Sequence, residues 1–194
     1  SNEAMHMSGL EAGGFDPQRA GVMLGCGIGG ITTILDEHVV LQNRGARRIS
    51  PFFVTKLIAN IAGGQIAIKW DLRGPNQTVT SACASATDAI GLALRLIQSG
   101  SADIMVAGGT EASICDLPLA GFSTIRALCN EADPPQSASR PFDKDRRGFV
   151  MGEGAGILVL ETEKHAQSRG ATIIGELAGY GSTNDAFHVT KPVE

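Results

Sequence analysis

Several features that define other protein classes are missing from this sequence. No run of about 18 apolar residues occurs, so we expect neither a membrane-spanning helix nor a membrane partner. Residues 1–14 lack a basic start followed by an apolar stretch, so no secretory signal is expected there. No CxxC pair occurs among the cysteines, which disfavours a zinc site or a redox dithiol. The cysteines are Cys26, Cys83, Cys115 and Cys129. Scattered thiols fit a reducing cytoplasm, where we expect the protein to reside.

Charge and composition narrow the class further. The formal net charge is −4 and 19% of the residues are charged, which argues against nucleic acid as the main partner. Glycine is over-represented, with 25 of 194 residues, although no collagen period or long polar tract occurs. The excess indicates tight turns and close backbone contacts rather than disorder. Because no linker-like stretch divides the chain, we expect one domain with one core.

Apolar runs bounded by glycine, proline or polar residues predict strands that alternate with helices. The expected strands are 22–24, 78–80, 103–107, 157–160 and 173–181, and the expected helices are 31–42, 84–99 and 161–169. Residues 52–70 carry apolar side chains at helical spacing, whereas residues 1–20 are expected to form a loop or a frayed edge. Helix 84–99 has the clearest apolar stripe, and Gly100 stands where a cap belongs. The alternation predicts an α/β fold with helices layered on a largely parallel or mixed sheet.

Gly25, Gly27 and Gly30 form the spacing GxGxxG between an expected strand and an expected helix. This spacing satisfies the fingerprint of dinucleotide-binding loops. The fingerprint requires an acidic residue about 20 positions later to hold the ribose, and residues 45–50 contain none. Arginines in that stretch could serve a 2′-phosphate, so an NADP-dependent dehydrogenase stays open as an alternative. The competing interpretation is a tight turn or the wall of a pocket.

Cys83 stands between an expected strand and the start of helix 84–99. Unpaired amides and the helix dipole converge at such a place and stabilise a thiolate. The neighbouring residues are all small, so a bulky acyl group could reach the sulfur, and a backbone amide could donate to the oxyanion. The alternative is that Cys83 is a small buried apolar residue. The other cysteines lack this setting and are interpreted as structural.

The run 140–156 is dense in charges of both signs and ends in a Gly-Glu-Gly turn before an expected strand. Such a loop folds back on itself through ion pairs. Glu153, between the two glycines, is interpreted as a structural anchor, with a catalytic carboxylate as the alternative.

Five motifs occur in an order that resembles one family. They are TSACASA (80–86), VAGGTEA (106–112), GFxxxRAL (121–128), RPFD to GEGAG (140–156) and DAFHVT (185–190). Together they resemble the β-ketoacyl-acyl-carrier-protein synthases, and most closely the type II, chain-elongating synthases of bacterial fatty-acid synthesis. The resemblance runs from residue 21 to the end, which leaves 1–20 as a poorly matched segment and 21–194 as a partial synthase domain. It implies a thiolase-like, layered α-β-α fold that is incomplete here.

The resemblance implies that Cys83 is the nucleophile of a ping-pong reaction. Cys83 would accept an acyl group from an acyl-carrier-protein thioester, and a malonyl thioester would then lose carbon dioxide and attack the acyl-enzyme. Ile28 and Phe53 match residues that line or gate the acyl tunnel, with Phe53 contributed by the other subunit of a homodimer. Phe122 and Arg126 match a mobile pair near the tunnel mouth. No metal or cofactor is implied.

The resemblance also implies contacts with the carrier protein. Thr190 matches a threonine that contacts the phosphopantetheine arm. Arg47 and Arg48 match a basic patch that docks the acidic carrier protein, and Arg126 is assigned to the same surface. Opposite charge on a local patch speeds encounter despite an acidic overall balance.

In the family, a C-terminal half supplies the two histidines and the lysine that activate the substrate thioester. The same half supplies the glycine-rich loop that gives the second oxyanion donor. We therefore expect this chain alone to be inactive in condensation. His188 is interpreted as structural, and His38 and His165 as solvated. Two rivals stay open: a ketosynthase of a polyketide pathway, and a non-catalytic partner subunit, against which the presence of Cys83 argues.

Overall fold

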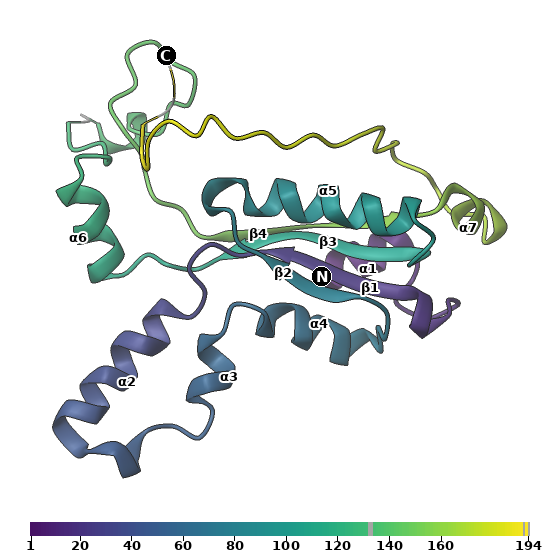
Figure 1. Ribbon diagram of the computed structural model, residues 1–194, viewed down its shortest axis with the longest axis horizontal. Coiled ribbons are helices and arrows are strands. Elements are labelled where there is room, and N and C mark those ends of the chain that lie inside the picture. The colour runs from purple at the N-terminus through teal and green to yellow at the C-terminus, as the bar shows by residue number, and fades with distance from the viewer. Residues whose placement is uncertain (132–133, 192, 194) are drawn as a thin grey trace.

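A computed structural model describes residues 1–131, 134–191 and 193, and one four-stranded sheet lies at its centre (Figure 1). The strands are β1 (Ala20–Gly25), β2 (Asn76–Val79), β3 (Ile104–Glu111) and β4 (Gly154–Glu161). Their order across the sheet is β2-β1-β3-β4. β1 runs parallel to β2 and β3, and β4 runs antiparallel to β3. The prediction of a largely parallel or mixed sheet is confirmed.

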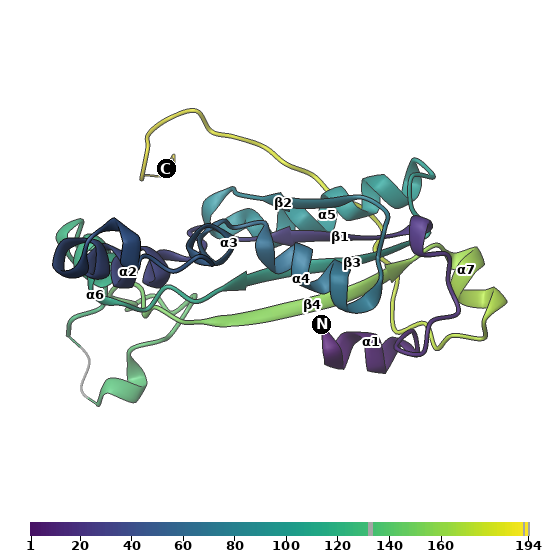
Figure 2. The same cartoon turned by 90° about the horizontal axis from the view of Figure 1, so that it is seen from below.

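Helices cover both faces of this sheet. The α-helices are α1 (Asn2–Ser8), α2 (Ile31–Arg44), α3 (Phe53–Leu57), α4 (Ile61–Trp70), α5 (Ser85–Gln98), α6 (Asp116–Thr124) and α7 (Glu163–Ser168). The 3₁₀ turns are η1 (Pro17–Arg19), η2 (Ala46–Arg48), η3 (Ala82–Ala84) and η4 (Pro135–Ser137). α5 lies on one face and α4 on the other, whereas α2 and α3 extend away from the sheet (Figure 1). Figure 2 shows α1 and α7 towards the end of the sheet opposite α2 and α6. Within the described residues, no helix has the length and apolar character needed to cross a membrane.

The central strands are buried on both faces, as their continuous apolar runs predict. Val22 and Val106 point towards the core under α4 and α1, whereas Met23 and Met105 point towards the core under α5. This alternation follows from the two-residue period of a strand. Each such side chain contributes on the order of 2 kcal/mol by leaving water. The two cores make a layered α-β-α arrangement, so the predicted fold class is confirmed.

The clearest predicted apolar stripe corresponds to α5, the helix that begins just after Cys83. α5 buries Ala89, Ala93 and Leu94 against the sheet and ends one residue before Ser99. Gly100 follows with a φ of 74°, and its amide donates to the Ile97 carbonyl at 3.0 Å. The expected glycine cap is therefore present.

The prediction for the start of the chain is wrong, and the middle of the chain is more divided than its apolar spacing shows. Residues 1–20 do not form a frayed loop, because Met5 and Leu10 bury their side chains in the core and hold α1 on the molecule. Residues 52–70 are helical over most of their length, as their apolar spacing indicates, but the helix is interrupted at Ile58, where the backbone is extended, with φ −69° and ψ 134°. Two separate helices, α3 and α4, result.

The predicted strand 173–181 is also wrong, since none of the described residues pairs with it. An isolated extended segment has no hydrogen-bonding neighbour and cannot form a ladder. This segment instead crosses the outer side of α5 (Figure 1), where the Tyr180 ring lies over Gly91. The predicted helix 161–169 begins two residues late, because β4 continues to Glu161.

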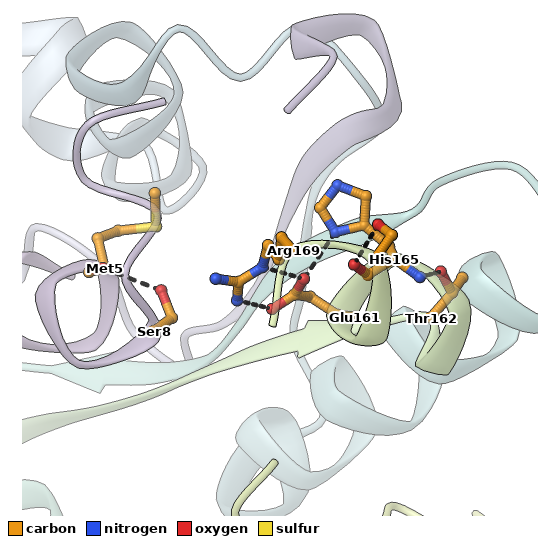
Figure 3. Close-up of polar contacts among 7 residues, drawn as sticks. Met5, Ser8, Glu161, Thr162, His165 and Arg169 are labelled. Atoms are coloured by element: carbon orange, nitrogen blue, oxygen red, sulfur yellow. Dashed lines mark hydrogen bonds and ion pairs between the residues drawn. The ribbon is translucent and has the colours of Figure 1, made fainter. Parts of the chain in front are cut away.

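Glu161 ties the end of β4 to α7 (Figure 3). Its carboxylate accepts a bidentate pair of hydrogen bonds from Arg169, one of them at 2.9 Å, and its Oε2 lies 2.7 Å from His165 Nδ1. The His165 amide donates to the Thr162 hydroxyl at 3.2 Å and caps the helix. His165 is thus partly buried and paired, which corrects its assignment as solvated, whereas His38 is exposed on α2 as expected.

We expect the free energy of unfolding to fall as the pH drops below 4.5. Burial alone would raise the pKa of the Glu161 carboxyl, but hydrogen bonds from Arg169 and His165 outweigh it and lower that pKa from its ordinary value of 4.5. A depressed carboxyl pKa stabilises the fold above the unfolded value, and this contribution is lost as the pH falls through the folded value. Urea unfolding between pH 6 and pH 3, roughly the range of carboxyl titration, measures the effect.

The matched pair for this measurement is Glu161→Gln and Glu176→Gln. Glu161→Gln should reduce the acid-induced decrease in the free energy of unfolding. Glu176→Gln should not, because Glu176 is exposed in the C-terminal segment. Equal acid profiles for the wild type and Glu161→Gln would contradict the prediction.

Candidate active site

The three parallel strands end at one edge of the sheet, and the loops that leave them meet there. β1 ends at Gly25, β2 at Val79 and β3 at Glu111. Figure 1 shows that these loops lead towards α2, α5 and α6. In open α/β sheets, ligands bind just beyond the carboxyl ends of the strands. Two of the predicted site residues, Ile28 and Cys83, lie in these loops.

Cys83 lies in η3, directly before α5, as its sequence setting predicts. It is exposed and forms no disulfide, so the alternative of a small buried residue is wrong. Ala82, just before it, has a φ of 51°, a left-handed conformation that is uncommon for a residue with a side chain. The Ser85 hydroxyl fixes this turn: it accepts from the Ser81 amide at 2.9 Å and donates to the Ala82 carbonyl at 2.7 Å. A free thiol is therefore held at the positive end of a 14-residue helix.

The first turn of α5 packs directly on the backbone of the sheet. A Cβ atom on Gly25 would lie 2.2 Å from the Ser85 carbonyl carbon, and one on Gly109 would lie 2.5 Å from the Ala86 Cβ. The small residues around Cys83 were expected to admit an acyl group. In the structure, Ser85 and Ala86 must also be small because the first turn of α5 lies so close to β1 and β3.

The glycine-rich loop after β1 is occupied by a side chain of the protein. Glu111 Oε2 accepts from the amides of Gly27 at 2.8 Å and Ile28 at 2.9 Å, and Oε1 accepts from the amide of Gly29 at 3.3 Å. A dinucleotide phosphate would need these same amides. The geometry therefore argues against the NADP-dependent alternative and favours the interpretation as a turn at a pocket wall.

An apolar pocket of about 250 Å³ brings two predicted residues together. Ile28, from the loop after β1, and Phe122, from α6, lie on its walls. The other lining residues are Ile31, Leu117, Pro118, Gly121 and Ile125. None of the lining side chains is polar, which suits an aliphatic chain that needs dry walls.

Phe53 does not lie in this pocket. It is half-buried at the start of α3 and lines a separate pocket of about 200 Å³ with Ile34, Leu41 and Ile49. The two pockets share no lining residue. Within one chain, the structure therefore does not bring Phe53 to Ile28 and Phe122.

The predicted carrier-docking arginines lie at two places. Arg47 and Arg48 are exposed in η2, at the end of α2 that points away from the sheet (Figure 1). Neither has a carboxylate partner within ion-pair distance among the residues that the structure describes. Arg126 is exposed just after α6, with a φ of 56°, and so follows the helix that lines the apolar pocket.

Thr190 is exposed in the C-terminal segment, and its amide donates to His188 Nδ1 at 3.0 Å. The Lys191 amide donates to the same nitrogen at 3.1 Å. His188 thus organises its own turn, in agreement with its interpretation as structural.

Glu153 and the remaining cysteines have structural surroundings. Glu153 Oε1 accepts from the Ile114 amide at 2.7 Å and joins the segments that follow β3 and precede β4, which supports its interpretation as an anchor. Burial, together with the nearby carboxylate of Glu111, raises the pKa of the Cys26 thiol. Cys115 and Cys129 are half-buried and free. In the described part of the chain, no cluster of histidine, cysteine and acidic side chains could hold a metal ion.

Two acidic residues near the site were not identified from the sequence. Asp88, in the first turn of α5, accepts from the hydroxyls of Ser81 and Tyr180, the latter at 2.6 Å, and the hydrogen bond from Ser81 contributes most to lowering its pKa. Glu111 was quoted only as part of a motif. Its signal is an acidic residue at the last position of an apolar strand, shortly after Gly108 and Gly109.

Comparisons with known proteins agree with this geometry. The family model described as "Beta-ketoacyl synthase, N-terminal domain" matches residues 1–166. The chain is 53% identical over 180 residues to the 3-oxoacyl-[acyl-carrier-protein] synthase 2 of Rhizobium meliloti (strain 1021), a match that covers 92% of this chain and 43% of that protein. The chain thus spans less than half the length of this curated relative.

Two solved structures share the fold. One is described as a type II PKS acyl-carrier protein in complex with its ketosynthase bound to the hexaketide, and it matches with a TM-score of 0.88 at 34% identity. That match covers 95% of this chain and 47% of the other. The second, a β-ketoacyl synthase from Burkholderia phymatum STM815, matches with a TM-score of 0.84 at 35% identity and covers 95% of this chain and 45% of the other.

Proposed function

Because this chain belongs to the β-ketoacyl synthase family, we propose that Cys83 takes up an acyl group from an acyl-carrier-protein thioester. The observation that carries the proposal is the exposed Cys83 thiol at the N-terminal end of α5. The Cys83 thiolate attacks the thioester carbonyl, the bond from that carbonyl to the carrier sulfur breaks, and the carrier thiol leaves with the proton that Cys83 gave up. Amide hydrogens at the start of α5 stabilise the oxyanion that forms between these steps.

The second half of the proposed reaction is a decarboxylative condensation. A malonyl-acyl-carrier-protein loses its carboxylate as carbon dioxide, and the resulting carbanion attacks the acyl carbonyl on Cys83. The Cys83 sulfur leaves as a thiolate, and the product is a 3-oxoacyl-acyl-carrier-protein lengthened by two carbons, as in fatty-acid elongation. The groups that activate the malonyl thioester are proposed to lie outside these 194 residues, so this chain alone is expected to condense nothing.

The proposed acyl site is the pocket lined by Ile28 and Phe122. Phe53 lines a different pocket of its own chain, which is compatible with its proposed role in the tunnel of a second copy in a homodimer. Residues 21–194 are proposed to be the partial synthase domain, with β1, the first strand along the chain, beginning at Ala20. Residues 1–20 pack on the same core, and the family model also covers them.

Arg47, Arg48 and Arg126 are proposed to dock the acidic carrier protein, and Thr190 to contact its phosphopantetheine arm. The exposure of all three arginines supports the docking surface. A related ketosynthase has been solved with its acyl-carrier protein, which supports a partner of this kind. A carrier-dependent enzyme of this type is proposed to act in the cytoplasm.

A ketosynthase of a polyketide pathway is the second candidate. It is favoured by the likeness to a type II PKS ketosynthase at 34% identity. The fatty-acid assignment is preferred, because the curated 3-oxoacyl-acyl-carrier-protein synthase is 53% identical. The retained Cys83 argues against a non-catalytic partner subunit.

The test is to incubate the chain with a dodecanoyl thioester of N-acetylcysteamine and to map the adduct by peptide mass spectrometry. The expected result is one dodecanoyl group on the peptide that contains Cys83. An unmodified chain, or an adduct confined to Cys115 or Cys129, would overturn the proposal.

A further inference from the structure

We propose that Glu111 is a positioning residue for the acyl pocket: its carboxylate holds the loop 27–30 so that Ile28 forms one wall. This inference rests on the proposed function, because it assigns the pocket to the acyl chain. It concerns a residue that contacts the loop backbone, not the reacting atoms.

The contact is specific in its geometry. The amides of Gly27, Ile28 and Gly29 all point at one carboxylate, with nitrogen–oxygen distances of 2.8, 2.9 and 3.3 Å. Successive amides that converge in this way form a concave site for an anion. Removing the carboxylate would take the shared acceptor from three successive amides, so this loop would lose its main restraint.

Neighbouring backbone fixes the other side of the loop. The Gly30 amide donates to the Leu57 carbonyl at 3.0 Å, and a Cβ on Gly30 would lie 2.3 Å from the Lys56 carbonyl oxygen. The loop is thus held between the end of α3 and Glu111. Relaxing the Glu111 contact frees only the half that carries Ile28.

The contact between Glu111 and the loop fixes the position of Ile28. Its side chain is 42% exposed and faces the apolar pocket opposite α6, so ordinary core packing does not fix it. Its amide donates to Glu111, which couples the position of the side chain to that carboxylate. Cys83 is not among the residues that line this pocket. A long acyl chain on its sulfur is therefore proposed to extend to this wall, whereas an acetyl group would not.

The experiment compares the rates at which dodecanoyl and acetyl thioesters of N-acetylcysteamine modify Cys83, measured by intact-protein mass spectrometry. In Glu111→Gln, the dodecanoyl rate should fall about tenfold and the acetyl rate should stay within about twofold, since a misplaced wall affects only the long chain. Asp16→Asn is the matched control. Asp16 also accepts a backbone amide, that of Gln18 at 2.9 Å, in the turn that precedes β1, and its variant should leave both rates unchanged.

A second variant separates positioning from general loosening. Ile28→Ala should produce the same selective loss with dodecanoyl, and the double variant should lose little more, because both changes act on one wall. An equal loss with both donors, no loss with either, or fully additive losses would overturn the inference.

Hydrogen exchange of the wild-type chain tests the contact without any variant. The amides of Gly27 and Ile28 should exchange more slowly than that of Gly14, which is exposed, and free-peptide rates would overturn the inference even if Glu111→Gln does not fold. A wild type that accepts neither donor overturns the proposed function instead, and the hold of Glu111 on the loop is then judged by exchange alone.

Discussion

Replacing Cys83 with alanine is expected to abolish acyl uptake while leaving the fold intact. The thiol is the proposed nucleophile, and a serine hydroxyl at this helix end is a much weaker nucleophile than a thiolate. The rate of adduct formation should fall at least about a thousandfold, the scale on which loss of a nucleophile acts. Because Cys83 is exposed, the substitution removes no core contact. Intact-protein mass spectrometry after exposure to a dodecanoyl thioester measures the loss.

Cys129→Ala is the matched control for this variant. Cys129 is free and half-buried, and it does not begin a helix, so its removal should leave adduct formation unchanged. An adduct that persists in Cys83→Ala, or one that disappears in Cys129→Ala, would refute the assignment.

Replacing Gly25 with alanine is expected to destabilise the chain by about 3 kcal/mol or more, the range of severe overpacking. The new Cβ would lie 2.2 Å from the Ser85 carbonyl carbon, 2.3 Å from its oxygen and 2.4 Å from the Ala86 nitrogen. All three atoms belong to backbone, so no side chain can rotate to relieve the contact. Urea unfolding followed by circular dichroism measures the change.

Gly154→Ala provides the comparison, because a Cβ at this position in β4 meets nothing within 4 Å. Its effect should stay within about 0.5 kcal/mol. Similar midpoints for the two variants would show that α5 can move away from the sheet, contrary to the packing described.

Local patterns in the sequence predict most of the layered fold. Burial of side chains is predicted by the apolar runs at β1 and β3 and by the apolar stripe of α5. The structure buries these side chains as expected. The place of Cys83 could be predicted for the same reason, because a strand, a short turn and a strong helix stand next to one another in the chain.

The parts that could not be predicted depend on contacts between distant segments. α1 is held by a core that β1 and β3 complete, so residues 1–20 carry no strong signal of their own. Residues 173–181 have the apolar composition of a strand, but composition does not supply a neighbour to pair with. Glu111 reaches a loop more than eighty positions earlier in the chain, and no local period reports such a contact.

The order of the strands also has a consequence for the speed of folding. The chain between β1 and β2 contains α2, α3 and α4, and the chain between β1 and β3 contains α5 as well. Both pairings of β1 must therefore close a long stretch of chain. Parallel pairs of this kind require long chain closures, which slow folding relative to proteins built from local contacts. β1, which is buried along its whole length in the folded chain, therefore stays unpaired until these closures form, and its free edges then favour association with other chains.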